Sequence, residues 1–164
     1  MPLLLVHGNN DTPAAVEIFR RAGVTIHRRE RDLGGLRFVG FGGDGTAPHD
    51  VELAEGESAH LQVAGAILLT HLPPRGRLAY GPDRPAPPRS PRATEADRIV
   101  EAPRAQVCGH IHHTEGVSYL GQTKVIKLRA AMANRCALLD LATLRTTFLD
   151  LEPGPHATSA ALTR

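Results

Sequence analysis

Three short apolar segments of this sequence each lead into a residue that can bind a metal ion. Short, continuously apolar runs are typical of buried parallel strands. Ligands of an open α/β sheet gather at the carboxyl ends of its strands, so residues remote in the sequence can share one site there. The pattern therefore predicts an α/β fold with one site at the strand ends. The segments and their residues are 3–6 with Asn9, 66–70 with His71, and 105–108 with His110.

The rest of the chain predicts strands and helices first and a meander of strands last. A helix is expected after Asp11, because Thr12 can cap it, Pro13 suits its first turn and Gly23 can end it. Together these segments predict one domain over residues 1–151 and a disordered tail over 152–164. Further strands are expected at 24–27, 36–41, 117–119, 124–128, 136–141 and 145–151, helices at 51–63 and 94–101, and a long loop at 72–92.

The composition is that of one globular domain. The chain has 164 residues, of which 41% are hydrophobic and 22% charged, so neither disorder nor a membrane protein is expected. Residues 3–6 are too few for a signal peptide or a membrane span, which predicts a soluble, cytoplasmic protein. A net charge of +2 and the lack of Trp do not indicate nucleic-acid binding. Cys108 and Cys136 are expected as core thiols.

A cluster of histidines follows the third apolar segment. In an extended backbone, His110 and His112 would project to the same side while Ile111 points into the core. His113 would point away from them. The cluster is internal, interrupted and preceded by a strand, which favours metal binding over a chance run of histidines. The other histidines are interpreted as ordinary core or surface residues: His7, His27, His49, His60 and His156.

The polar residues at the three strand ends resemble the last three motifs of the calcineurin-like metallophosphoesterases. The order and spacing are similar, and the resemblance runs from residue 3 to about residue 151. It is nearest to the small bacterial and archaeal phosphodiesterase-like branch. The matching residues are Gly8-Asn9-Asn10-Asp11, Thr70-His71 followed by Pro73-Pro74, and Gly109-His110-Ile111-His112.

The resemblance implies a two-sheet sandwich flanked by helices (α/β/β/α) and hydrolysis of phosphate esters by a hydroxide that bridges two divalent cations. Asn9, His71 and His110 would hold one cation, and His112 would help to hold the other. Manganese is the first expectation, and zinc, iron, nickel or cobalt also suit these ligands. Many relatives have a histidine at the position of Asn10, whose amide can orient phosphate but is no useful acid, and this favours diesters.

The sequence departs from the family's pattern at its start. The family opens with an Asp-x-His and a Gly-Asp motif, and neither precedes Gly8, so the domain is interpreted as N-terminally truncated. The remaining ligands are neutral, so a dinuclear site should bind poorly and the chain should have weak activity or none. Asp44 is not assigned as a substitute ligand, and Arg75 or Arg77 could contact phosphate.

Three explanations of the missing motifs stay open, of which a start codon placed too late is favoured. The others are a real truncated product and completion by another chain, including a homo-oligomer that covers an exposed sheet edge. A second function also stays open: a non-catalytic interaction module that keeps the fold. The retention of Asn9, His71, His110 and His112 favours the enzyme.

Overall fold

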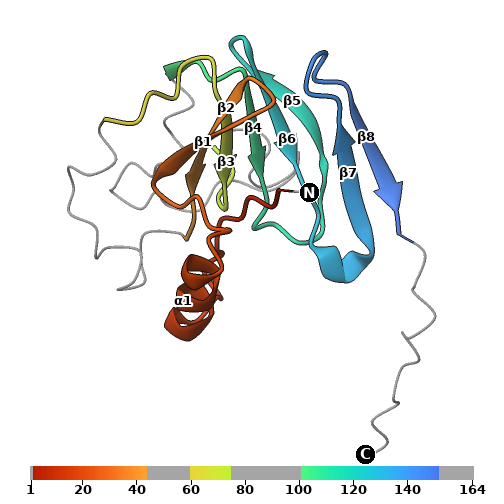
Figure 1. Ribbon diagram of the computed structural model, residues 1–164. Helices are drawn as coiled ribbons and strands as arrows, with labels where there is room; N and C mark the ends of the chain where they lie inside the picture. Colours follow the sequence, from red (N-terminus) through yellow and green to blue (C-terminus); the bar gives the residue numbers. More distant parts are fainter. Residues whose placement is uncertain (1, 44–59, 75–100, 152–164) are drawn as a thin grey trace, which may run out of the picture.

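A six-stranded mixed sheet lies at the centre of the computed structural model, which describes residues 2–43, 60–74 and 101–151 (Figure 1). A two-stranded sheet stands beside it, and one α-helix precedes the first strand of the described part. The elements are α1 (Pro13–Arg21), β1 (Arg29–Leu33), β2 (Leu36–Phe41), β3 (Ile67–Thr70), β4 (Ala105–Cys108), β5 (Gly116–Leu120), β6 (Thr123–Lys127), the 3-10 helix η2 (Ala131–Ala133), β7 (Arg135–Leu139) and β8 (Thr146–Asp150).

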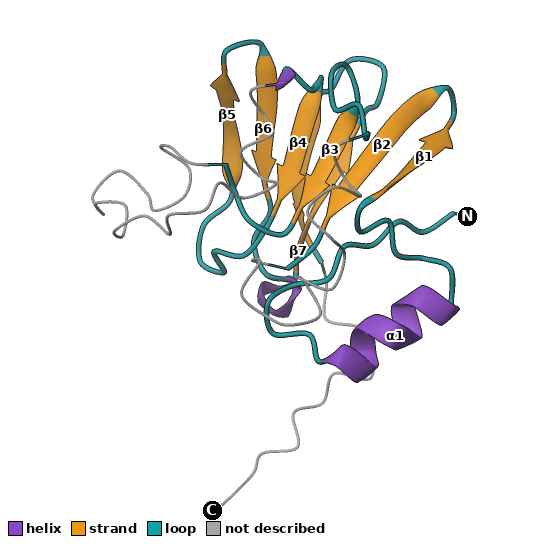
Figure 2. Cartoon of the chain, turned by 90° about the vertical axis from the view of Figure 1, so that its left-hand side faces the viewer, coloured by secondary structure: helices purple, strands orange, loops and turns teal. Residues whose placement is uncertain are grey.

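The central strands of the large sheet are parallel, and both edges are antiparallel. The strand order is β1-β2-β3-β4-β6-β5, as Figure 2 shows, with β2, β3, β4 and β6 running in one direction. The last residues of these four strands are register partners: Phe41 pairs with Thr70, Thr70 with Cys108, and Cys108 with Lys127. The loops that follow them therefore leave the sheet side by side.

The two faces of this sheet carry separate apolar clusters, because successive side chains of a strand point to opposite faces. One cluster lies on the face of Val39 and Leu68. The other lies on the face of Phe38 and Ile67, where Ile26 packs. The first also contains Phe41, Leu61, Val63 and Ala66; the second is joined by Leu4, Val6, Leu33, Leu36, Leu69, Val107 and Leu144.

The helix and the buried strands agree with the sequence prediction. Helix α1 begins after Thr12, whose Oγ1 accepts a hydrogen bond from the backbone N–H of Ala15 at 3.3 Å. The strands predicted at 36–41, 66–70 and 105–108 are β2, β3 and β4. The mixed α/β class is thus confirmed for the described residues.

Other predicted elements need correction. Residues 3–6 and 24–27 form only isolated parallel bridges, Leu5 with Thr25 and His27 with Gly40. Strand β1 was not predicted. Residues 60–63, at the end of a predicted helix, are not helical, while 51–59, 75–100 and the tail from 152 lie outside the described residues.

The predicted meander is in fact two hairpins. Strands β5 and β6 are antiparallel, but β6 then pairs in parallel with β4. Among the described residues, β7 pairs only with β8, in a sheet of its own. The described residues contain one α-helix, α1, and none of its residues is buried. No helix in this part of the chain has both the length and the apolar character needed to cross a membrane.

Candidate functional site

The loops after β3 and β4 begin beside one another at the carboxyl edge of the sheet. The backbone N–H of His71 donates to the carbonyl of Phe41 at 3.1 Å, and that of Gly109 donates to the carbonyl of His71 at 3.1 Å. These bonds continue the parallel pairing one residue past the strand ends. These hydrogen bonds hold the backbone in place at His71 and at Gly109, the residue that precedes His110.

Three polar side chains from these loops and from the loop after residues 3–6 meet at one point. Nε2 of His71 lies 2.8 Å from Oδ1 of Asn9 and 3.0 Å from Nδ1 of His110. The two imidazole rings stand edge to face, with centroids 4.9 Å apart and an interplanar angle of 84°. The prediction that these three residues converge is confirmed.

The spacing of these atoms suits ligands of one cation. Adjacent ligands of an octahedral ion with bonds of about 2.1 Å lie about 3.0 Å from each other. The distances from His71 Nε2 to Asn9 Oδ1 and to His110 Nδ1 match that separation. Each atom can offer a lone pair, and a shared cation would use all three at once. The chemistry of the donor set therefore fits a divalent metal ion.

The backbone around the cluster takes uncommon conformations. His110 has a φ of 70°, in the left-handed region, where a residue with a Cβ is disfavoured and which recurs at functional sites. Gly8 faces His71 so closely that a Cβ at position 8 would lie 2.9 Å from the ring's Cε1. The N–H of Gly8 donates to Oδ2 of Asp11 at 2.6 Å, which closes the turn that carries Asn9. Gly8 is therefore needed for the approach of the two loops.

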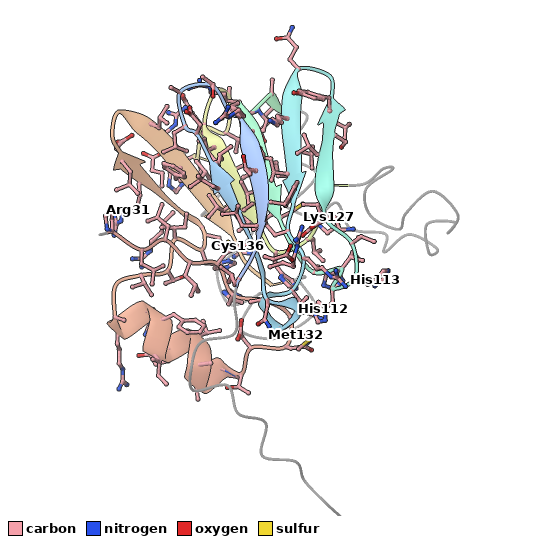
Figure 3. The ribbon with its side chains drawn as sticks, turned by 90° about the vertical axis from the view of Figure 1, so that its right-hand side faces the viewer. Arg31, His112, His113, Lys127, Met132 and Cys136 are labelled. Carbon is pink, nitrogen blue, oxygen red and sulfur yellow. The ribbon has the colours of Figure 1, made fainter. Side chains whose placement is uncertain are left out.

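His112 does not follow the alternation that the sequence predicted. The backbone is not extended after Cys108, because His110 takes a left-handed conformation and His112 and His113 lie in a turn. Both side chains are exposed on the loop between β4 and β5 (Figure 3). Within residues 2–43, 60–74 and 101–151, no three or more His, Cys, Asp or Glu side chains are grouped to hold a metal ion. A ligand role for His112 stays a prediction.

The other residues considered in the sequence are not part of this cluster or lie outside the described part of the chain. Asn10 is exposed beside the half-buried Asn9, and its role in catalysis stays a prediction. Asp44, Arg75 and Arg77 lie outside the described residues, as do His49 and His156. Both cysteines are free thiols: Cys108 is buried, as expected, but Cys136 is only half-buried.

A second pair of histidines supports the loop of Asn9 and was not predicted. His7 is buried, and its ring centroid lies 4.6 Å from that of His27. The N–H of Gly42 donates to Nδ1 of His27 at 2.7 Å, and the N–H of Gly43 donates to the carbonyl of His7 at 2.8 Å. The loop after β2 is thereby tied to the residue that precedes Gly8. The position of His7 between an apolar run and Gly8 is the signal that could have identified it.

A buried lysine lies at the same edge of the sheet. Lys127, the last residue of β6, is 1% exposed, and its Nζ donates to Oγ1 of Thr114 in the loop that carries the histidines. Burial lowers the pKa of Lys127 and raises the pKa of the neighbouring thiol of Cys108 to about 12. The sequence does not distinguish Lys127 from an exposed strand residue. Its contact with Thr114 anchors the loop after His110.

Comparisons with known proteins find a similarity in sequence to an uncharacterized protein. No family model matches it. It is 27% identical over 138 residues to the uncharacterized protein MJ1162 of Methanocaldococcus jannaschii, a match that covers 77% of this chain and 63% of that protein. The chain thus spans less than two thirds of that relative's length.

Two solved structures share the fold. The crystal structure of TT1561 of Thermus thermophilus has a TM-score of 0.67 and 16% identity, and the match covers 93% of this chain and 73% of TT1561. Another crystal structure has a TM-score of 0.64 and 19% identity, and the match covers 93% of this chain and 66% of that one. At these identities the likeness establishes the fold alone.

Proposed function

We propose that this chain belongs to a metal-dependent phosphoesterase of the calcineurin-like type, with a phosphodiester as its substrate. The observation that carries the proposal is the meeting of Asn9, His71 and His110, with His71 within 3.0 Å of both others at the strand ends. These are the residues to which the resemblance assigns one cation. The resemblance rests on sequence motifs alone. The short distances between these three side chains therefore support the proposal independently.

The cation would be held by Oδ1 of Asn9, Nε2 of His71 and Nδ1 of His110. Manganese is the first candidate, and zinc, iron, nickel and cobalt also suit two imidazoles and an amide oxygen. A divalent ion bound there supplies positive charge for a phosphoryl oxygen and lowers the pKa of water. The three ligands are neutral, so a second cation, with His112 among its ligands, would require carboxylates from elsewhere in the whole protein.

The substrate preference follows from Asn10. Its side-chain amide can donate a hydrogen bond to a phosphoryl oxygen, but it cannot deliver a proton to a leaving group. Diesters and other esters with good leaving groups are therefore preferred. In this proposal the six-stranded and two-stranded sheets are the two layers of an α/β/β/α sandwich. The hydrolase would be cytoplasmic, and neither a nucleic acid nor a membrane is indicated as its partner.

Metal titration of single alanine variants tests the site without relying on activity. Purified chain is titrated with Mn²⁺ or Co²⁺ by calorimetry, and its metal content is measured by mass spectrometry. His71→Ala and His110→Ala should each weaken binding at least about tenfold, because each loses one of three ligands. His113→Ala is the matched control, an exposed histidine three residues from His110, and it should bind like the parent chain. Equal metal affinity in the parent chain and the three variants would refute the proposed metal site.

Hydrolysis separates the enzyme from the alternative function. The chain is assayed with bis-p-nitrophenyl phosphate and added manganese, and weak turnover that His71→Ala abolishes is expected. Metal binding without turnover, both in this chain and in a variant extended by Asp-x-His and Gly-Asp motifs, would favour a non-catalytic interaction module. Strong turnover by these 164 residues would contradict the argument that a neutral ligand set limits activity.

A further inference from the structure

The two edge strands of the six-stranded sheet differ sharply in charge. Strand β1 at one edge has the sequence RERDL, in which all four charged residues are exposed. Strand β5 at the other edge has the sequence GVSYL and no charge. Figure 2 shows the two strands at opposite ends of the sheet. Charged side chains on an edge strand hinder pairing with another chain, so β1 is protected and β5 is not.

Self-pairing of β1 would bring like charges together. If two copies paired antiparallel about a twofold axis at Arg31, each Arg31 would face Arg31 of the other copy. Glu30 would then face Asp32 of the second copy. Like charges directly opposite each other in a sheet are destabilising. The sequence of β1 therefore opposes this arrangement.

Self-pairing of β5 meets no such obstacle and places favourable partners together. An antiparallel pair about a twofold axis at Ser118 would set Val117 opposite Tyr119 of the second copy, and an aromatic residue opposite a β-branched one is a favourable cross-strand pair. Both side chains have room for it, since Val117 is 39% and Tyr119 67% exposed. In the described part of the chain, β6 is the only strand that pairs with β5.

We propose that β5 pairs antiparallel with β5 of a second copy of this chain, forming a twofold dimer with one sheet continuous across both copies. A twofold axis suits the interface because one uncharged strand provides both of its sides. The pairing uses backbone groups of an edge strand together with the exposed Val117, Tyr119 and Leu120. It is independent of the metal site, which lies at the carboxyl ends of the parallel strands.

Two double variants test the pairing and its register. V117K/Y119K places lysine opposite lysine at two positions of the dimer, whereas V117K/Y119E places lysine opposite glutamate at the same positions. Both change exposed side chains, and circular dichroism checks that both fold. Analytical ultracentrifugation of the full chain should show a dimer, a dissociation constant raised at least about tenfold in V117K/Y119K, and a dimer retained in V117K/Y119E.

The control is Leu138→Lys on β7, whose side chain is 64% exposed, close to the 67% of Tyr119. It should leave the dimer intact. A monomeric parent chain at about 100 µM, a concentration far above typical specific dissociation constants, overturns the proposal. So do loss of the dimer in Leu138→Lys, an unchanged dimer in V117K/Y119K, and equal dissociation of the two double variants.

Discussion

Replacement of Gly8 by alanine should damage the candidate metal site without touching a ligand. The new Cβ would lie 2.9 Å from Cε1, 3.2 Å from Nδ1 and 3.3 Å from Nε2 of His71, whereas ordinary contact begins at 3.4 Å. The ring or the loop of Asn9 must therefore retreat by about 0.5 Å, more than the roughly 0.2 Å tolerance of metal–ligand distances. The ring has little freedom to do so between Asn9 and His110.

The expected size of the effect follows from the cost of overpacking. Adding a methyl group to a well-packed position costs about 1–3 kcal/mol. If that cost falls on the metal-bound arrangement, the dissociation constant rises about 5- to 150-fold, at about 1.4 kcal/mol for each factor of ten. If it falls on the folded chain as a whole, the free energy of unfolding drops by a similar amount. Calorimetric titration with Mn²⁺ and urea unfolding measure the two quantities.

Gly109→Ala is the matched control, because it changes the other glycine that precedes a ligand. Its Cβ would lie 3.9 Å from the carbonyl oxygen of His71, an ordinary contact. We expect an affinity within about threefold of the parent chain and a small change in stability. If Gly8→Ala matched Gly109→Ala in both affinity and stability, the close approach of the two loops would be wrong.

Four further predictions concern the thiols, the lysines of β6 and the charge of the ligand set. Burial raises the pKa of Cys108 to about 12, so a thiol reagent should label only Cys136 in the native chain and both thiols after denaturation. Because the unfolded thiol loses its proton near 9.0 and the folded one near 12, the urea midpoint should fall as pH rises between these values, and Cys108→Ala should reduce the fall. Lys127→Met should speed hydrogen exchange of the backbone in residues 109–114, since it removes the bond to Thr114, whereas Lys124→Met, whose Nζ contacts the carbonyl of Leu144, should not. Asn9→Asp should tighten Mn²⁺ binding about tenfold in calorimetry, because it adds a carboxylate to neutral ligands.

The strands of the sheet could be predicted where their side chains are buried, because buried strands are rich in apolar residues. Strands β2, β3 and β4 are rich in apolar residues because most of their side chains are buried, and the prediction found them almost to the residue. Strand β1 was missed because an edge strand in solvent needs no apolar pattern, and its charges serve to prevent pairing. Residues 3–6 were apolar enough to predict a strand, but they make only one bridge, and Leu4 and Val6 pack against the Ile26 cluster.

The candidate site was also predictable only in part: the parallel strands that lead to it could be predicted, but the local backbone conformation could not. The meeting of His71 and His110 follows from the parallel strands β3 and β4, whose ends lie level, and hydrophobic patterns can predict that arrangement. Asn9 comes from the loop after residues 3–6, which make only one bridge, between Leu5 and Thr25. The position of His112 depends instead on the φ of 70° at His110. A left-handed conformation is signalled most strongly by glycine, and although histidine is enriched there among the other residues, one histidine in a sequence is too weak a signal to predict it. The alternation of side chains along a strand therefore predicts their direction only where the backbone stays paired in the sheet. Strand β4 ends at Cys108, before His110 and His112.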